Sequence, residues 1–278
     1  MTRPRICIFS TVHLAHDVRL FQAQARTLAR AGFEVSVIAL ADATETKTDG
    51  VSVQTLPPAG NRWVRLLRIP TILRLAGRQQ ADLYAFHDPE LLPAAALLRL
   101  LTGRPVVYDV HEDVPASIRN RGYLAAPLRP AVALVYRLVE LVCLPLIAGI
   151  SLADEAYERY YRRRRTVTVL NYPLLDHAGL YQPLPRHGRE AATLVYTGSV
   201  TRLRGLVEMI DLVHRLRPRF PHLRLEVVGP IGSHEESAMA ERQIEDLRLG
   251  DCVELAGAVS HAEVHRRIAA ADIGLALL

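Results

Sequence analysis

The sequence contains few cysteines and only one lysine, and these shortages exclude several classes of protein. Its three cysteines, among 278 residues, are Cys7, Cys143 and Cys252. An odd number of widely spaced cysteines does not suit a disulfide framework or a cysteine metal site, so we expect buried thiols in a reducing compartment. Lys47 is the only lysine, beside many arginines. Since no zinc-ligand spacing and no aromatic RNA-binding motif accompanies them, we expect neither a metal nor a nucleic-acid partner.

Long hydrophobic runs and targeting segments are also missing. The apolar start of the chain is interrupted by His13 and Asp17 before a signal peptide could be complete, so it predicts the first strand of a sheet. Residues 131–144 are apolar but contain Arg137, and a central arginine costs about 2.5 to 3.5 kcal/mol in a membrane-spanning helix. We therefore expect a buried helix there, followed by a strand over 146–150. The protein is expected to be cytoplasmic, with peripheral contact with the membrane as the alternative to full solubility.

The composition is that of a globular protein with anionic partners. Half of the residues are hydrophobic, and the length suits about two domains with sizeable cores. The formal net charge is +5 and the isoelectric point is about 9.3. A net positive charge of this size favours anionic partners such as nucleoside diphosphates or acidic membranes, and it is equally compatible with both.

Strand and helix patterns alternate along the whole chain, which predicts an α/β protein with mostly parallel, doubly wound sheets. In the first part the expected strands are 5–10, 34–39, 51–55, 82–86, 105–108, 146–150 and 167–170, with helices at 18–31, 62–79, 89–101, 131–144 and a last one through 160. In the second part they are 193–197, 224–228, 253–256 and 273–277, with helices at 204–216, 235–249 and 261–271. We expect domains at 1–170 and 191–278, joined by a linker at 171–190 that is rich in proline, glycine and histidine.

Two neighbouring strands of the first domain end in titratable side chains. His87 and Asp88 follow the strand at 82–86, and Pro89 with Glu90 then starts a helix. The strand at 105–108 is followed by Asp109, His111 and Glu112. Because open α/β sheets bind ligands at the carboxyl ends of their strands, we expect these imidazoles and carboxylates to share one rim.

The second domain begins with a strand, a glycine-containing loop and a helix, in the stretch YTGSVTRLRGL. Gly198 and Gly205 allow a close approach of the backbone, and we expect free N–H groups where Arg204 opens the helix. Arg202 and Arg204 add full positive charges with bidentate donors. A diphosphate would suit such a loop, although a solvated turn can carry the same residues.

Four motifs in this order, HDPELL, YDVHED, NYP at 171–173 and YTGSVTRLRGL, resemble those of a bacterial family 4 glycosyltransferase over the whole chain. The resemblance implies the GT-B architecture of two facing Rossmann-like domains. It also implies transfer of a sugar, with retention at the anomeric carbon, from a UDP- or GDP-sugar to a hydroxyl acceptor. The acceptor would be a glycan or a lipid-linked molecule used in cell-surface polysaccharide or glycolipid synthesis.

The resemblance also implies roles for individual residues. His87 would lie at the reaction centre, and we add Asp88, His111 and Glu112 as catalytic candidates. The leaving nucleoside diphosphate would be stabilised without a metal cofactor. Donor binding is expected at seven positions: Gly198, Ser199, Arg202, Arg204, Gly205, Gly229 and Gly257.

The sequence departs from the family pattern in three places. The family continues past the strand equivalent to 273–277 into a helix with a Glu-x7-Glu pair, whereas this sequence stops at Leu278, so we expect an incomplete second domain. Many members have a glycine pair where residues 11–14 stand, and Ser199 replaces an arginine. The alternatives are therefore a non-catalytic GT-B-like binding protein or inactive fragment, and a sugar-nucleotide epimerase.

Some of these residues also have simpler interpretations. His111 and Glu112 could instead form a structural clamp with Arg119 or Arg121. For Asp17 and Arg19, which resemble the family's Asp-x-Arg, a helix N-cap with a local ion pair is preferred. The remaining histidines considered, His13, His16, His234, His261 and His265, lack a metal-ligand context.

Residues 62–78 interleave arginine with Trp63, Leu66, Leu67 and Leu73. This pattern is typical of a helix that lies on an anionic membrane, but also of a helix that packs on a sheet with its arginines solvated. The packing interpretation is preferred.

Overall fold

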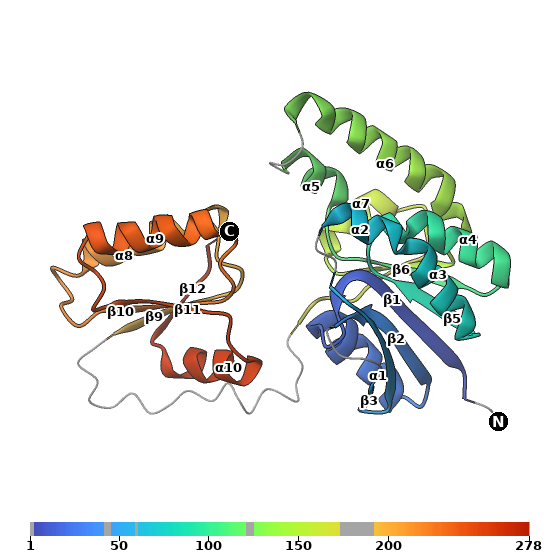
Figure 1. The fold of residues 1–278 in the computed structure, drawn as a ribbon, viewed down its shortest axis with the longest axis horizontal. Coiled ribbons are helices and arrows are strands. Elements are labelled where there is room, and N and C mark those ends of the chain that lie inside the picture. Colours follow the sequence, from blue (N-terminus) through green and yellow to red (C-terminus); the bar gives the residue numbers. More distant parts are fainter. Residues whose placement is uncertain (1–2, 42–45, 59–60, 121–124, 173–191, 278) are drawn as a thin grey trace. The chain divides into compact units, whose positions relative to one another are not determined.

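The computed structural model describes residues 3–41, 46–58, 61–120, 125–172 and 192–277, in two compact units, Met1–Tyr172 and Pro173–Leu278 (Figure 1). Each unit is a Rossmann-like α/β structure built on a mainly parallel sheet. The predicted fold class is confirmed.

Unit 1 contains an eight-stranded sheet in the order β3-β4-β2-β1-β5-β6-β7-β8. Its strands are β1 (Arg5–Leu14), β2 (Glu34–Leu40), β3 (Thr46–Thr48), β4 (Val51–Leu56), β5 (Leu83–Phe86), β6 (Val106–Val110), β7 (Gly149–Leu152) and β8 (Thr166–Thr168). All neighbours pair in parallel except β3 and β4. The chain therefore starts in the middle of the sheet and builds outwards on both sides, as in a doubly wound fold.

The helices of unit 1 lie on both faces of this sheet. They are η1 (Val18–Ala25), α1 (Arg26–Arg30), α2 (Arg62–Leu67), α3 (Ile69–Arg78), η2 (Pro89–Leu91), α4 (Leu92–Thr102), α5 (Val114–Asn120), η3 (Ala126–Leu128), α6 (Arg129–Cys143), η4 (Leu144–Leu146), η5 (Glu155–Tyr157) and α7 (Glu158–Tyr161). The sequence analysis did not predict β3 or α5. Their sequences are short and carry little periodic signal.

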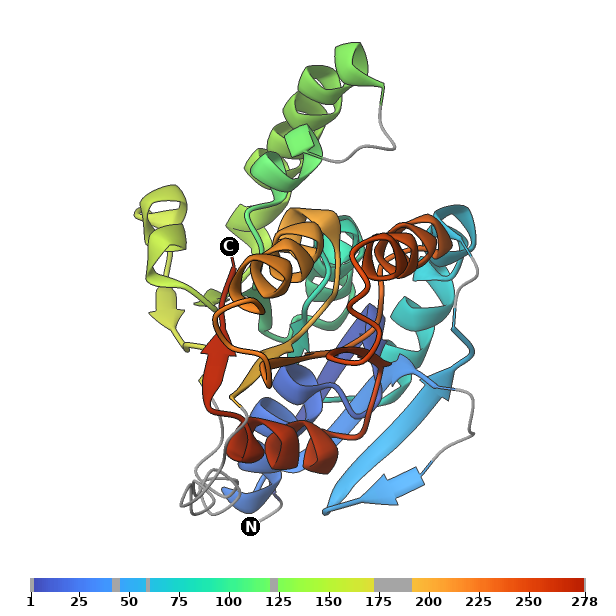
Figure 2. The same cartoon turned by 90° about the vertical axis from the view of Figure 1, so that its left-hand side faces the viewer.

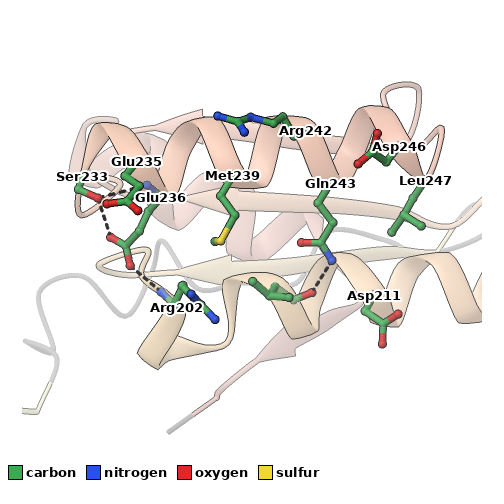
Figure 3. Close-up of a pocket in the computed structure, with 11 residues that line it drawn as sticks. Arg202, Asp211, Ser233, Glu235, Glu236, Met239, Arg242, Gln243, Asp246 and Leu247 are labelled. Atoms are coloured by element: carbon green, nitrogen blue, oxygen red, sulfur yellow. Dashed lines mark hydrogen bonds between the residues drawn. The ribbon is translucent and has the colours of Figure 1, made fainter.

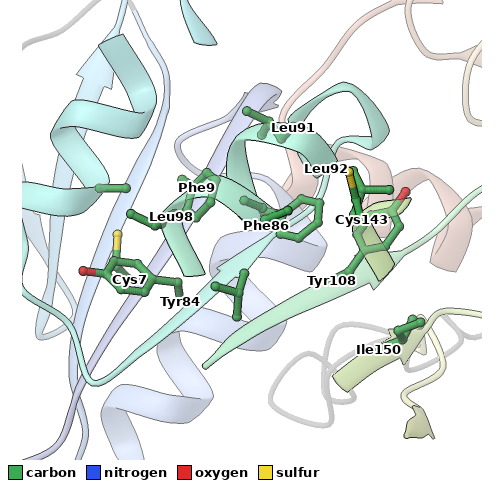
Figure 4. Packing of buried hydrophobic residues seen from close by; sticks show 14 of the residues in the cluster. Cys7, Phe9, Tyr84, Phe86, Leu91, Leu92, Leu98, Tyr108, Cys143 and Ile150 are labelled. Carbon is green, nitrogen blue, oxygen red and sulfur yellow. The ribbon is translucent and has the colours of Figure 1, made fainter. Parts of the chain in front are cut away.

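Side chains of β1 alternate between two hydrophobic cores. Cys7 and Phe9 belong to the cluster that α3 and α4 cover, shown in Figure 4. Ile6 and Ile8 belong to a second cluster, with Leu20 of η1. Because successive residues of a strand point to opposite faces, a strand buried on both sides becomes continuously apolar. Burial raises the pKa of the Cys7 thiol to about 12, and all three cysteines are buried and free, as predicted.

The first helix differs from the predicted regular helix over 18–31. Residues Val18–Ala25 form a π-helix, and only Arg26–Arg30 are α-helical. Asp17 caps this helix, because its Oδ1 accepts hydrogen bonds from the backbone N–H groups of Arg19 and Leu20. π-Helical turns are rare and occur often at functional sites.

The prediction that residues 131–144 form a buried helix is correct for the helix but wrong for its burial. Figures 1 and 2 show that much of α6 extends away from the sheet, with α5 beside it. Two of its side chains are buried, Glu140 and Cys143, both near its end. A row of apolar side chains is exposed instead: Val132, Leu134, Val135, Leu138, Leu141 and Val142. Apolar composition predicted burial here, but no neighbouring element among the described residues covers this face.

Unit 2 contains a four-stranded parallel sheet in the order β11-β10-β9-β12. Its elements are β9 (Thr193–Thr197), η7 (Arg202–Arg204), α8 (Leu206–Leu216), β10 (Arg224–Val228), α9 (His234–Asp246), β11 (Val253–Gly257), α10 (His261–Ala270) and β12 (Ile273–Leu275). Helices α8 and α9 cover one face of the sheet, and α10 lies on the other (Figures 1 and 2). The strands occur where the sequence predicts them, with ends that differ by at most two residues.

None of the described helices combines the length and the apolar character that crossing a membrane requires.

Candidate functional site

The carboxyl ends of three adjacent parallel strands bring three histidines together. His13 lies near the end of β1, His87 directly after β5, and His111 directly after β6. The ring centroids are 5.0 Å apart for His13 and His111, 5.4 Å for His13 and His87, and 6.1 Å for His87 and His111. We call these three residues the histidine cluster. One ring nitrogen from each lies within 4.8 Å of the other two.

The three imidazoles differ in exposure. The side chain of His87 is 0% exposed, whereas that of His13 is 16% exposed and His111 is half-buried. One nitrogen of each ring is buried without a hydrogen-bond partner among the described residues: Nε2 of His13, Nε2 of His87 and Nδ1 of His111. Buried polar atoms in proteins are nearly always satisfied, so this group is exceptional.

Asp109 supports the cluster from within β6. Its carboxylate accepts two hydrogen bonds from the Arg19 guanidinium, one from Nε at 2.7 Å and one from a terminal nitrogen at 2.9 Å. Arg19 also donates a hydrogen bond to the carbonyl of Val169. Nδ1 of His87 lies 3.1 Å from Oδ2 of Asp109. Burial alone would raise the pKa of Asp109, but the close imidazole of His87 and the guanidinium of Arg19 lower it well below the usual range. Asp109 is therefore a fixed negative charge.

Asp88 is held in one orientation by residues of the carboxyl-terminal half of β1. Its Oδ2 accepts hydrogen bonds from the hydroxyl of Ser10 at 2.7 Å, and from the backbone N–H and the hydroxyl of Thr11 at 2.6 and 3.1 Å. The other oxygen, Oδ1, lies 3.8 Å from Nε2 of His13. The Thr11 hydroxyl also reaches Glu90, which pairs with Arg65.

The carboxylates around the cluster act on the pKa of His13. Its Nδ1 lies 3.2 Å from Oδ2 of Asp17. Burial would lower the pKa of His13, but the contact with Asp17 and the nearby charges of Asp88 and Asp109 raise it. In return the pKa of Asp17 falls to about 2, because the bond from His13 and the bonds from the backbone N–H groups of Leu20 and Arg19 together outweigh burial. The pKa of His111 is lowered by burial and by the neighbouring imidazoles.

The structure thus brings together three of the four catalytic candidates, His87, Asp88 and His111, with Asp109, which was also expected at this rim. Glu112 accepts a hydrogen bond from the hydroxyl of Ser117 instead, and Arg121 lies outside the described residues. Asp17 caps its helix as expected. The expected local ion pair of Arg19 is wrong, because the side chain reaches Asp109, ninety positions away.

The roles of His13, Ser10 and Thr11 in this site were not predicted, and neither was the pairing of Asp109 with Arg19. The available signal was the position of His13 at the end of the first strand. In a doubly wound sheet the first strand lies beside a strand that comes much later in the sequence. Here that strand is β5, and His87 follows it directly.

In unit 2, three glycine loops follow one another along the carboxyl edge of the sheet. The N–H of Gly198 donates to Val228, and the N–H of Gly229 donates to Gly257. Gly229 has φ 144°, and a Cβ there would lie 1.7 Å from the carbonyl oxygen of Gly198. Only glycine fits at this crossing. The structure therefore places Gly198, Gly229 and Gly257 side by side.

The loop after β9 is more tightly bonded than predicted. Residues Arg202–Arg204 form a 3-10 turn, and α8 begins only at Leu206, after Gly205 with φ 76°. The N–H groups of Arg204 and Gly205 bond within the turn, and that of Arg202 donates to Glu236. These three N–H groups are therefore not free for a phosphate. The side chains of Ser199, Arg202 and Arg204 are exposed.

A groove of about 1000 Å³ lies between α8 and α9 (Figure 3). Arg202 is at one end, beside Ser233, Glu235 and Glu236, and Gln243 bridges the two helices by donating to the carbonyl of Val207. Of the seven donor-binding candidates only Arg202 lines this groove. Four carboxylates line it against two arginines, so it is poorly suited to a diphosphate: Asp211, Glu235, Glu236 and Asp246.

Comparison with solved structures shows the same fold in enzymes that act on sugars. Sucrose-phosphate synthase from Thermosynechococcus elongatus is 16% identical, with a TM-score of 0.74 over 98% of this chain and 75% of that one. HepE of Anabaena, solved with UDP and glucose, is 15% identical, with a TM-score of 0.65 over 98% and 73%. A UDP-forming trehalose-phosphate synthase from Burkholderia vietnamiensis is 13% identical, with a TM-score of 0.63 over 99% and 77%. At these identities the likeness establishes the fold, which is that of GT-B glycosyltransferases. No curated protein matches the chain at a significant level.

The family itself is established by a sequence match that spans most of unit 1. Residues 18–171, more than half of the chain, match the family model described as a glycosyl transferase 4-like domain. The match includes Arg19, His87, Asp88, Asp109 and His111, which the structure gathers at one rim of the sheet. The chain belongs to the family of glycosyl transferase 4-like domain proteins.

Proposed function

We propose that this protein transfers a sugar from a nucleoside diphosphate sugar, UDP- or GDP-linked, to a hydroxyl acceptor, with retention at the anomeric carbon. The observation that carries the proposal is the family match over 18–171, in a unit whose matched residues converge on one imidazole and carboxylate site. GT-B neighbours solved with UDP, UDP-glucose and ADP support a nucleotide donor.

Unit 2 would bind the donor at the edge formed by its three glycine loops. The exposed side chains of Arg202 and Arg204 can turn towards a diphosphate there, since neither guanidinium forms an ion pair or hydrogen bond among the described residues. Charge-assisted bonds from guanidinium groups are stronger than neutral ones and develop further as the leaving diphosphate gains charge. The backbone N–H groups of Arg202, Arg204 and Gly205 are already hydrogen-bonded, so they would contribute little to diphosphate binding. The arginine side chains would therefore provide most of it.

Unit 1 would hold the acceptor and the sugar that is transferred. His13 and His111 are the two imidazoles of the cluster that are partly exposed, so they are the ones placed to touch a substrate. His87, fully buried, would act as a positioning residue through the cluster. Asp109 stays ionised and thereby stabilises positive charge that develops on the imidazoles.

The acceptor would be a glycan or a lipid-linked molecule used in cell-surface polysaccharide or glycolipid synthesis, reached from the cytoplasmic face of the membrane. The exposed apolar row of α6 supports peripheral contact with an anionic membrane. Residues Arg162–Arg164 line a groove together with Leu138 and Leu141 of α6, so basic and apolar side chains meet there. Residues 62–78 are the segment whose sequence is also typical of a membrane-binding helix. There Arg65 pairs with Glu90, and Arg68 donates a hydrogen bond to the carbonyl of Pro57. The observations therefore favour α6.

Calorimetric titration tests the donor assignment. UDP and GDP are titrated into the wild-type chain and into Arg204→Ala, with Arg215→Ala as the matched control, because Arg215 lies on α8 in an exposed pair with Asp211. A charge-assisted contact is worth about 1.5 to 3 kcal/mol, so Arg204→Ala should weaken binding about 10- to 150-fold and the control should not. If neither nucleotide binds the wild type, or if Arg204→Ala binds equally well, the donor assignment is refuted. Proton NMR of the product anomer then tests retention.

A further inference from the structure

Four consecutive arginines, Arg162–Arg165, stand between α7 and β8 in unit 1. All four are exposed, and among the described residues none of their guanidinium groups forms an ion pair or a hydrogen bond. A guanidinium stays protonated in proteins, so the run carries four permanent positive charges. Like charges this close repel one another, and an external anion relieves the repulsion.

The fold anchors this arginine run at both ends. On one side, the buried Tyr161 donates its hydroxyl hydrogen bond to Glu140 of α6 at 3.0 Å, and its backbone carbonyl accepts from the N–H of Arg164 at 2.8 Å. On the other side, the carbonyl of Arg165 accepts from the N–H of Ile150 in β7 at 2.9 Å. The arginines are therefore presented by a fixed turn.

A hollow of about 400 Å³ lies beside the run. Four arginines line it, and the rest of its lining is aliphatic or glycine: Arg99, Arg163, Arg164 and Arg165 provide all of its charge. No carboxylate of the described residues lines it, unlike the groove between α8 and α9. A hollow with charge of one sign from several arginines suits an anion that carries more than one negative charge.

Arg99 contributes a guanidinium that is fixed from another element. It lies half-buried in the last turn of α4 and donates a hydrogen bond to the carbonyl of Gly103. This bond uses one of its five N–H donors and leaves the others for a ligand. Because guanidinium forks match phosphate oxygens in bidentate pairs, the hollow has the chemistry of a phosphate site.

This hollow lies at the edge of the sheet opposite the histidine cluster. Gly149, which begins β7, lines the hollow, and Arg165 directly precedes β8, so both mark the amino ends of their strands. The cluster instead follows the carboxyl ends of β5 and β6. At a rise of about 3.3 Å per residue, the step from Val106 to His111 along β6 is about 16 Å. A phosphate in the hollow is therefore remote from the reacting sugar.

The surface next to the hollow favours a lipid as the carrier of the phosphate. The hollow shares Leu144, Arg163 and Arg164 with the groove that Leu138 and Leu141 line, and these two leucines belong to the exposed apolar row of α6. A soluble phosphate or an RNA offers nothing apolar to that row, whereas a lipid offers acyl chains beside its headgroup. The site adds a headgroup to the membrane contact proposed above and rests on that contact.

We propose that Arg99, Arg163, Arg164 and Arg165 bind the phosphomonoester headgroup of an anionic membrane lipid. A phosphomonoester presents three acceptor oxygens and carries about −1.5 to −2 charges near pH 7. A phosphodiester has two free oxygens and a single charge. Several guanidinium forks around one hollow therefore favour the monoester over a diester.

Vesicle sedimentation with the whole chain tests this preference. Phosphatidylcholine vesicles contain either phosphatidic acid, a phosphomonoester, or phosphatidylglycerol, a phosphodiester, adjusted to the same surface charge by electrophoretic mobility. We expect the wild type to bind the phosphatidic acid vesicles about tenfold more tightly, since a charge-assisted bond contributes at least that factor.

Variants separate the hollow from the neighbouring groove. Arg99→Gln with Arg165→Gln should reduce the preference to less than about twofold, because these two arginines line the hollow and not the groove of Leu138 and Leu141. The control, Arg215→Gln with Arg219→Gln, removes the same charge from exposed positions of unit 2 and should keep the preference. Circular dichroism confirms folding. If the first variant does not fold, Arg99→Lys with Arg165→Lys keeps the charge without the forks and should lower the preference about threefold.

Four results would overturn the lipid assignment. Equal binding of the wild type to both anionic vesicles would remove the phosphate site and leave the membrane contact of α6 in place, whereas binding to neither would remove both. If glycerol 3-phosphate without lipid binds as tightly as the vesicles, the ligand is a soluble phosphate. If single-stranded RNA binds through Arg99 and Arg165 while vesicles do not, the partner is a nucleic acid. Calorimetry with UDP and GDP uses no lipid, so a failure of donor binding leaves this site standing.

Discussion

Replacing Arg19 with methionine should destabilise unit 1 strongly, and the loss should depend on pH in a defined direction. The side chains of Arg19 and Asp109 are only 7% and 2% exposed, and the guanidinium makes two bonds to the carboxylate. Removal of one partner of a buried ion pair leaves an uncompensated charge and typically costs about 3 to 5 kcal/mol. In a unit of this size each kcal/mol lowers the melting temperature by about 2 to 4 °C, so the transition should fall by roughly 6 to 20 °C.

The pH dependence follows from the pKa of Asp109. In the wild type this pKa is lowered in the folded state, so the carboxylate contributes stability above its unfolded pKa and loses it as the pH falls towards the folded value. Without Arg19, the imidazole of His87 is the remaining contact that lowers this pKa and burial opposes it, so the folded pKa rises and less stability is lost as the pH falls. The difference in unfolding free energy between wild type and Arg19→Met should therefore shrink as the pH falls below the unfolded pKa of an aspartate, about 3.9.

Differential scanning calorimetry separates the transitions of the two units and measures both effects. The matched control is Arg104→Met, because Arg104 forms an exposed pair with Asp82 at 3.3 Å, with side chains 56% and 41% exposed. Exposed pairs contribute little, so the control should leave the transition almost unchanged. A loss below about 1 kcal/mol for Arg19→Met, or a gap that widens towards acid, would refute the claim that the Arg19 and Asp109 pair organises the site.

Three further predictions concern other parts of the molecule. Gly229→Ala should destabilise unit 2 by several times the effect of Gly250→Ala, measured by urea denaturation, because its Cβ would overlap the carbonyl of Gly198 while Gly250 has open space; equal effects would contradict the close crossing of the loops. By NMR, the pKa of His13 should lie above that of an ordinary histidine, and Asp17→Asn should lower it. The stability that its protonation contributes should be present below the unfolded pKa and be lost as the pH rises through the folded one. If Asp17→Asn leaves the His13 titration in place, Asp17 is not its partner. The chain should co-sediment with anionic but not neutral vesicles at low salt, and Leu134→Ser with Leu141→Ser should reduce this; binding that the double change leaves intact would remove α6 from the contact.

The sequence predicted those parts of the molecule that depend on local pattern. The strands of unit 2 have alternating or continuous apolar residues between clear turns, and β9 and β10 have the predicted bounds. His87, Asp88 and His111 follow directly after their strands, so the topology alone brings them to one rim.

The rest depends on contacts between residues that are far apart in the chain. Nothing near Arg19 in sequence announces Asp109, and the π-helix that carries Arg19 has the composition of an ordinary α-helix. His13 gains its environment from β5 and β6, so its sequence neighbours could not assign it to a cluster. The apolar residues of α6 predicted burial, because composition reports hydrophobicity and not whether a neighbour covers the helix.

Release of nucleoside diphosphate from a donor sugar tests the central claim most directly. UDP- and GDP-sugars are incubated with the wild-type chain and a cell-envelope extract as acceptor, and the released UDP or GDP is quantified, with calorimetry for donor affinity. The account predicts that one donor class is consumed and that His111→Ala, confirmed folded, lowers turnover at least tenfold while leaving donor affinity unchanged, because the cluster lies in unit 1 and not at the donor loops. Turnover that persists unchanged in His111→Ala and in a folded His87→Ala, or no release from any nucleotide sugar by the wild type, would contradict it.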